Sequence, residues 1–204
     1  RGVTHLRAGD EVLGARTGSF AEYVSGRMFV RKPAGLTFEQ AASIPGAATT
    51  ALQGLRDRGR LQPGQRVLII GASGGVGTFA VQIARALGAQ VTAVCSTQNV
   101  ELVRSLGADR VIDYTREDFT RDGQRYDVIF DVSADRSFAD YRRALATDGT
   151  LVMAGAPHGG FVKILVRMLR ARLLSGSVKP QRLVPFIAQH SKKDLVVLKE
   201  LIEA

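Results

Sequence analysis

The sequence predicts an α/β protein with a doubly wound parallel sheet, and three observations carry this prediction. From residue 66 onward, short apolar runs alternate with amphipathic helical patterns, which is typical of parallel strands joined by right-handed crossovers. The apolar run at residues 67–70 breaks into closely spaced glycines and continues as a helical pattern. The 204 residues are 45% hydrophobic, so the chain can bury a sizeable core.

Each element is placed by its local pattern. We expect strands at residues 66–70, 90–95, 110–113, 128–131, 150–154 and 183–187, where apolar and β-branched residues gather. Helices are expected at residues 75–87, 100–106, 137–145, 161–174 and 194–202, where apolar residues recur at helical spacing. Gly107 gives a stop signal after one helix, and Asp148 with Gly149 predicts a turn before a strand.

The first 36 residues follow a different pattern. Residues 9–12 and 20–24 look like short strands separated by glycine-rich turns, so we predict a β-rich segment, the tail of a truncated domain. Residues 37–44 and 47–58 predict two helices that are broken at Pro45 and Gly46. We therefore divide the chain into residues 1–36 and a second domain at residues 37–204. Because the chain begins with Arg1, we expect it to be a piece of a longer protein.

The glycine run after the first predicted strand is a candidate phosphate cradle. A strand that turns sharply into a helix points backbone N–H groups and the positive end of the helix dipole at whatever lies beyond. Gly74 and Gly77 fill the second and third places of the dinucleotide fingerprint, and Ala72 stands in the first. A tight turn without a ligand has the same spacing, but the flanking strand and helix favour a dinucleotide. The candidate residues here are Gly71, Ser73, Gly74, Gly75, Val76 and Gly77.

The end of the second predicted strand bears on the choice of dinucleotide. An Asp or Glu about 20 residues after the glycine turn would bind the ribose diol and repel a 2′-phosphate. Ser96 and Thr97 stand there instead, which predicts NADP(H) and makes NAD(H) the less favoured cofactor. Ser96 is equally suited to capping the next helix, and the two roles are compatible. The residues that follow, Gln98 and Asn99, supply no cation.

The net charge of +9 is unevenly distributed. Residues 161–204 hold 9 Lys and Arg against 3 Asp and Glu, and the predicted helix at 161–174 has an apolar stripe opposite a basic face. Such a helix suits docking on a sheet, and it also suits contact with an acidic membrane surface or a partner. No apolar run is long enough to span a bilayer, and we expect no nucleic-acid binding.

The single cysteine, Cys95, rules out an internal disulfide and a zinc site built on several thiolates. Its place at the end of a predicted buried strand indicates a small core residue rather than a nucleophile. This cysteine usage fits a reducing compartment, so a cytoplasmic location is expected.

Several segments together resemble the medium-chain dehydrogenase/reductase superfamily, in its zinc-free quinone oxidoreductase-like branch. They are residues 9–12, 18–24, 36–45, 51–55, 71–77, 106–109 and 111–114. The resemblance implies a Rossmann nucleotide-binding domain preceded by the tail of a GroES-like catalytic domain. It also implies hydride transfer from NAD(P)H to a polarised carbon, commonly the β-carbon of an α,β-unsaturated ketone or a quinone.

The resemblance implies further site residues. Thr50 would lie against the nicotinamide ring, and the turns at Val132 and Gly155 would lie beside its carboxamide and ribose. Tyr114 would lie near the adenosine phosphate, with Arg116 as a candidate cation. No catalytic residue is assigned.

The same resemblance bears on metal binding. Zinc-using relatives keep a cysteine at the position that matches Gly46, which has no side chain to bind a metal. No metal is therefore predicted. Without a Lewis acid, developing negative charge on the substrate must be stabilised by hydrogen bonds or a proton donor.

The leading hypothesis is an NADPH-dependent, zinc-independent oxidoreductase that acts on a small-molecule electrophile, a quinone or an α,β-unsaturated carbonyl compound. The alternative is a nucleotide-binding interaction protein whose basic C-terminal helix contacts a partner, a membrane or RNA. Relatives often dimerise at an edge strand. Residues 183–187 are the candidate edge for a homodimer, although Pro185 would block pairing on one side.

Overall fold

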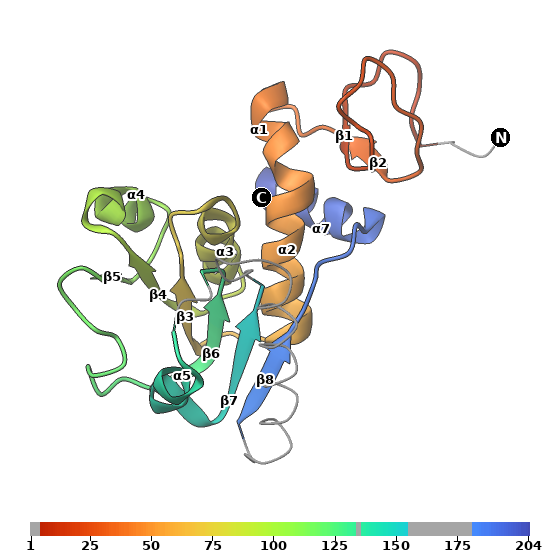
Figure 1. Ribbon diagram of the computed structural model, residues 1–204. Coiled ribbons are helices and arrows are strands. Elements are labelled where there is room, and N and C mark those ends of the chain that lie inside the picture. The colour runs from red at the N-terminus through yellow and green to blue at the C-terminus, as the bar shows by residue number, and fades with distance from the viewer. Residues whose placement is uncertain (1–4, 134–135, 155–180) are drawn as a thin grey trace.

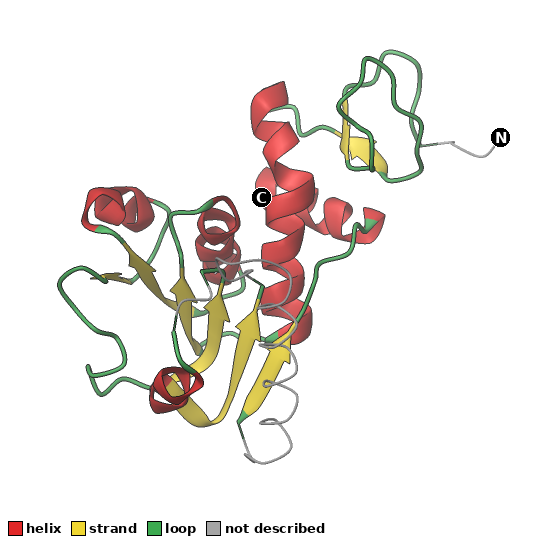
Figure 2. Ribbon diagram, viewed as in Figure 1, coloured by secondary structure: helices red, strands yellow, loops and turns green. Residues whose placement is uncertain are grey.

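The computed structural model describes residues 5–133, 136–154 and 181–204, and a six-stranded parallel sheet forms its centre (Figures 1 and 2). The strands are β3 (Arg66–Ile70), β4 (Gln90–Cys95), β5 (Arg110–Asp113), β6 (Tyr126–Asp131), β7 (Leu145–Met153) and β8 (Arg182–Pro185). Their order across the sheet is β5-β4-β3-β6-β7-β8. This is the Rossmann order, in which the winding reverses between the two central strands. The predicted doubly wound α/β fold is confirmed.

The central strand β3 shows why the sheet is buried on both faces. Val67 and Ile69 pack into the core on one face, while Leu68 and Ile70 pack into the core on the other. Successive side chains of a strand point to opposite faces, so a continuous apolar run serves two cores at once. The four residues are at most 5% exposed.

The helices cover the sheet in two layers. They are α3 (Gly75–Ala86), α4 (Val100–Ser105), α5 (Phe138–Ala144) and α7 (Lys192–Glu203). Buried residues of α3, α4 and α7 join the core of Val67 and Ile69, whereas Tyr141 of α5 joins the core of Leu68. Among the described helices, none is both long and apolar enough to cross a bilayer.

The break expected at Pro45 and Gly46 is wrong. Four helical segments follow one another and form the long helix of Figure 1, namely α1 (Phe38–Ser43), η1 (Ile44–Ala48), α2 (Thr49–Leu52) and η2 (Gln53–Arg58). Both η segments are π-helical turns. A proline ring clashes with the preceding turn of an α-helix and lacks an N–H donor, and we attribute the wider π turn around Pro45 to this constraint. The expected start is confirmed, because Thr37 and Gln40 form a capping box.

The N-terminal strands lie elsewhere than expected. β1 (Val12–Gly14) and β2 (Phe29–Arg31) form a two-stranded antiparallel sheet that contacts α1 and α7. Residues 20–24, a predicted strand, have no strand conformation, and Phe20 and Tyr23 are fully exposed. Alternating apolar and polar residues do not form a strand unless a partner accepts their backbone hydrogen bonds. The proposed boundary near residue 36 stays a prediction.

Several boundaries also differ from the expected ones. β7 begins at Leu145 rather than at residue 150, because the chain enters the sheet directly after α5. β8 ends at Pro185, and it is the outermost strand beside β7 in the described part of the sheet. Gly155 and the basic segment 161–174 lie outside the described residues.

Candidate functional site

The turn between β3 and α3 is built around two glycines with different constraints. Gly71 has a φ of +81°, and a Cβ added there would lie 2.8 Å from Cγ2 of Val132. A Cβ added to Gly77 would lie 2.1 Å from the carbonyl oxygen of Gly71 and 2.7 Å from Cα of Ala72. Gly77 therefore allows the first turn of α3 to pack directly on the chain that leaves β3.

The backbone between these two glycines is open toward an anion. Gly74 is the N-cap of α3, in extended conformation, and it offers no side-chain acceptor to the first turn. The N–H groups of Gly75, Val76 and Gly77 therefore lack an intrahelical partner, as the first turn of any helix does. A Cβ on Gly75 would meet nothing within 4 Å. The turn thus fits the pyrophosphate of a dinucleotide, which the dipole of the 12-residue α3 would further stabilise.

A groove of about 510 Å³ lies next to this turn, at the carboxyl ends of the central strands. Residues from β3, β4 and the loops after β4, β5 and β6 line it: Ile70, Gly71, Ser73, Val94, Cys95, Ser96, Tyr114, Phe119, Ser133 and Arg136. Ligands of open α/β sheets bind in this crevice, where the winding of the sheet reverses. The structure therefore brings together four predicted site residues, Gly71, Ser73, Ser96 and Tyr114.

Other predicted residues lie around the groove rather than in its lining. Val132 borders Gly71, and its N–H donates to the carbonyl of Ile70 at 3.1 Å. Thr50 lies in α2, half-buried, and its hydroxyl donates to the carbonyl of Gly46 at 2.9 Å. A contact between Thr50 and the nicotinamide thus stays a prediction, as does any role for Gly155, outside the described residues.

Ser96 occupies the N-cap position of the short helix at Thr97–Asn99, but its side chain does not cap the backbone. Its hydroxyl instead accepts a hydrogen bond from Nδ2 of Asn99 at 3.0 Å. This bond uses one of the two acceptor lone pairs of Ser96 and leaves its proton available to a ligand oxygen.

The carboxylate of Asp113, at the end of β5, is held by hydroxyl groups. Thr97 donates to it at 2.6 Å and Thr115 at 2.8 Å, while Arg116 Nε lies 3.5 Å away. The hydrogen bond from Thr97, followed by those from Thr115 and the charge of Arg116, holds the pKa of the Asp113 carboxyl below its usual range despite burial. The side chain of Thr97 thus donates a hydrogen bond to Asp113, and that of Arg116 forms an ion pair with it.

A buried hydrogen-bond network fixes the loop after β6. Asp131 is fully buried, and its carboxylate accepts hydrogen bonds from the hydroxyl of Tyr141 at 2.7 Å and from the N–H of Ser133 at 3.1 Å. Burial of a carboxylate is costly unless donors satisfy it, so this arrangement indicates a structural role for Asp131. Cys95 is likewise buried, and burial raises the pKa of its thiol.

Phe119 and Arg136 also line the groove, and neither was predicted from the sequence. Arg136 immediately precedes Ser137, the N-cap of α5, which forms a capping box with Asp140. A capping box fixes the entry of the chain into a helix, and this signal could have placed Arg136 near the sheet edge. Phe119 lies in a loop without helical or strand periodicity, so no comparable signal exists for it.

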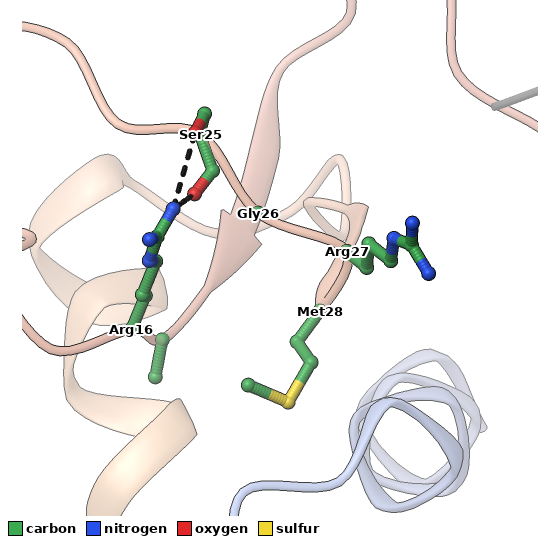
Figure 3. A pocket seen from close by; sticks show the side chains of 6 residues that line it. Arg16, Ser25, Gly26, Arg27 and Met28 are labelled. Carbon is green, nitrogen blue, oxygen red and sulfur yellow. Dashed lines mark hydrogen bonds between the residues drawn. The ribbon is translucent and has the colours of Figure 1, made fainter. Parts of the chain in front are cut away.

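A second hollow, of about 460 Å³, lies in the N-terminal β unit (Figure 3). Arg16 reaches across its rim to the carbonyl and hydroxyl oxygens of Ser25. Residues 15–16 and 25–28 line this hollow, and none of them belongs to the glycine turn. Within the described ranges, no group of three or more His, Cys, Asp or Glu residues is arranged to hold a metal ion.

Comparisons with known proteins identify the family of this chain. The family model of zinc-binding dehydrogenases matches residues 75–182. The mitochondrial NAD(P)H oxidoreductase RTN4IP1 of Mus musculus is 50% identical over 123 residues, which are 55% of this chain and 31% of that protein. The 2-methylene-furan-3-one reductase of Solanum lycopersicum is 35% identical over 199 residues, which are 87% of this chain and 51% of that protein.

Among solved structures, the quinone oxidoreductase of Coxiella burnetii matches with a TM-score of 0.69 at 28% identity, over 85% of this chain and 52% of that one. The chain thus spans between about a third and about half of the length of these relatives. Because the family model covers more than half of the 204 residues, and the sheet has the Rossmann order, the chain belongs to the zinc-binding dehydrogenase family of the medium-chain dehydrogenase/reductase superfamily, with a quinone oxidoreductase-like relationship.

Proposed function

We propose that this chain is the nucleotide-binding part of an NADPH-dependent, zinc-independent reductase. The observation that carries the proposal is the glycine turn beside a groove at the switch point of the sheet. The backbone N–H groups of Gly75 and Val76 would hold the pyrophosphate, and Ser73 would border it. When bound, the dinucleotide supplies a hydride.

The preference for NADPH is supported by what lines the groove at the end of β4. Ser96 presents a hydroxyl there, and none of the described lining residues carries a carboxylate. A hydroxyl donates a hydrogen bond to a phosphate oxygen, whereas a carboxylate would repel it. Tyr114 lies in the same lining, 54% exposed, and its phenol offers a second donor.

The proposed substrate is a small electrophile, a quinone or an α,β-unsaturated carbonyl compound. The names of two relatives support this class, a quinone oxidoreductase and a 2-methylene-furan-3-one reductase. The chain's own part in the reaction is to bind and orient the dinucleotide, and we propose no proton donor among its residues.

Zinc independence rests on the resemblance at Gly46 and on the presence of one cysteine, Cys95, in the whole chain. We propose a cytoplasmic location from the same cysteine usage. We also propose a homodimer that joins the sheets of two copies at β8, the outermost strand of the described sheet.

The cofactor preference is tested with Ser96→Asp. The new carboxylate should bind the ribose diol and repel the 2′-phosphate, so the affinity for NADPH should fall about tenfold or more while that for NADH rises. Calorimetric titration of both dinucleotides measures the ratio. Ser105→Asp, at an exposed position of α4, is the matched control and should leave it unchanged.

A wild-type chain that binds neither dinucleotide would overturn the proposed function. An unchanged ratio in Ser96→Asp would instead overturn the assignment of Ser96 to the adenosine ribose. Metal analysis of the purified chain should find no stoichiometric zinc, and a chelator should leave NADPH binding unaltered. Stoichiometric zinc would contradict zinc independence.

A further inference from the structure

We propose that Arg136 is the cation that binds the 2′-phosphate of the adenosine ribose, an inference that rests on the proposed NADPH site. Arg136 is a residue of the groove lining that neither the glycine fingerprint nor the end of β4 predicts. The proposal follows from how the guanidinium is held, from the absence of an ion pair within 4 Å among the described residues, and from the other groups around the groove.

Arg136 is positioned in two ways, its guanidinium by an aromatic ring and its backbone by a hydrogen bond. Its Cζ lies 5.5 Å from the centre of the Phe119 ring, and Phe119 is 2% exposed, so the platform is rigid. The backbone N–H of Arg136 donates to the hydroxyl of Tyr141 at 3.3 Å, and that hydroxyl donates to the buried Asp131. A guanidinium fixed in this way loses less conformational entropy when it binds a ligand.

Arg136 has no close ion-pair partner among the described residues, although its charge contributes, after hydrogen bonds from Thr120 and Ser137, to lowering the pKa of the Asp118 and Asp140 carboxyls. It is the only charged side chain among the described residues of the groove lining, and it forms no ion pair within 4 Å with any described residue. Arg116, the cation expected from the resemblance, is 74% exposed and faces Asp113 instead. The residues after β4 that could have supplied a cation, Gln98 and Asn99, are neutral.

The pyrophosphate and the 2′-phosphate of NADPH would then be bound by different parts of the site. The first turn of α3 already supplies N–H groups and a helix dipole for the pyrophosphate. A monoester phosphate carries about −1.5 to −2 charges on one phosphate, compared with about −1 on each phosphate of the pyrophosphate, and the hydroxyl groups of Ser96 and Tyr114 do not neutralise it. A planar guanidinium donates two parallel hydrogen bonds to phosphate and suits this remaining group.

The test is calorimetric titration of the 204-residue chain and of Arg136→Gln with two pairs of ligands. NADPH is compared with NADH, and adenosine 2′,5′-bisphosphate with AMP. Loss of a charge-assisted pair should weaken NADPH and the bisphosphate about tenfold to a hundredfold, and NADH and AMP less than about threefold. Arg136→Lys should retain part of the preference, because the charge remains but the planar fork is lost.

Arg121→Gln is the matched control, because Arg121 is 83% exposed, pairs with Asp118 and is not part of the groove lining. Equal losses for NADPH and NADH in Arg136→Gln would place Arg136 at the pyrophosphate and overturn the proposal. So would a loss of preference in Arg116→Gln rather than in Arg136→Gln. If the wild-type chain binds no dinucleotide, the proposed function falls together with this inference. Normal NADPH affinity in a folded Arg136→Gln variant overturns this inference alone.

Discussion

Gly74 and Gly77, at the β3–α3 turn, are needed for different reasons. Gly77 has no space for a Cβ, since the carbonyl oxygen of Gly71 would lie 2.1 Å from it. Gly74 has a φ of −79° and a ψ of 170°, which any residue adopts, and the nearest atom to an added Cβ lies 3.4 Å away. The fold therefore requires Gly77, whereas only an approaching ligand would require Gly74.

Alanine substitutions separate the two requirements. Gly77→Ala should lower the free energy of unfolding by about 2–3 kcal/mol, because backbone atoms must move apart. Gly74→Ala should change it by less than about 1 kcal/mol yet weaken NADPH binding about tenfold or more, because the Cβ obstructs the pyrophosphate. Urea unfolding and calorimetric titration measure these quantities. Gly75→Ala, whose Cβ has open space, should affect stability least. Unaltered NADPH affinity in Gly74→Ala would contradict the cradle.

At this scale the sequence predicted the residues that follow each strand but not those brought in by loops. Ser96 and Tyr114 directly follow β4 and β5, and parallel strands carry such residues to one edge of the sheet. Arg136 and Phe119 reach the same groove through loops, and their pairing depends on the packing of Phe119 beneath α5. Loops have no periodic sequence pattern, so the contact between Arg136 and Phe119 could not be predicted from the local sequence.

Among the helices, α7 is tied to the long helix of residues 37–58 by one buried carboxylate. Asp194, 6% exposed, accepts hydrogen bonds from Arg56 at 2.6 Å and from Gln53 at 2.7 Å. Burial by itself would raise the pKa of the Asp194 carboxyl, but these two donors outweigh burial and hold the pKa below its usual range. The ionised carboxylate therefore stabilises the contact between the two helices.

Replacing this carboxylate should produce a pH-dependent loss of stability. Asp194→Asn should lower the free energy of unfolding at pH 7 by about 1–3 kcal/mol, because the amide leaves buried donors poorly paired. A carboxyl whose pKa is lowered by folding stabilises above its unfolded pKa of about 4, and that contribution is lost as the pH falls through the folded pKa. The difference between wild type and variant should thus be constant from pH 7 to about 5 and shrink below about pH 4.

Urea unfolding at several pH values measures this difference. Glu203→Gln is the control, since Glu203 lies in the same helix, is 46% exposed and pairs with Lys199 at 3.6 Å. The control should change stability by less than about 0.5 kcal/mol. A difference for Asp194→Asn that grows toward acid pH would contradict the account, because it would mean that the acidic form of Asp194 is the stabilising one.

The elements themselves were predicted to different degrees for physical reasons. β3, β4 and β5 lie where expected, because buried parallel strands are continuous apolar runs bounded by glycine and polar residues. The helix across Pro45 was not predicted, because local propensity favours a break there. The apolar face of this helix stabilises it without a break, because Ala48 and Leu52 are fully buried in the hydrophobic core.

For the whole molecule, the alternation of strands and helices sufficed to predict the parallel sheet, whereas the strand order became known only from the structure. The N-terminal unit was harder, because β1 and β2 have three residues each and pair across a long connection. So short a strand carries little pattern of its own, and the pairing is decided by contacts with α1 and α7.

The central claim is that the edge of the sheet formed by the ends of β3, β4 and β5 holds NADPH. Amide hydrogen exchange of the 204-residue chain, followed by mass spectrometry with and without NADPH, tests it most directly. We expect NADPH to slow exchange at residues 71–77, 94–97 and 114–119 and to leave exchange in α7 unchanged. Binding of NADPH with protection confined to segments outside these three would contradict it.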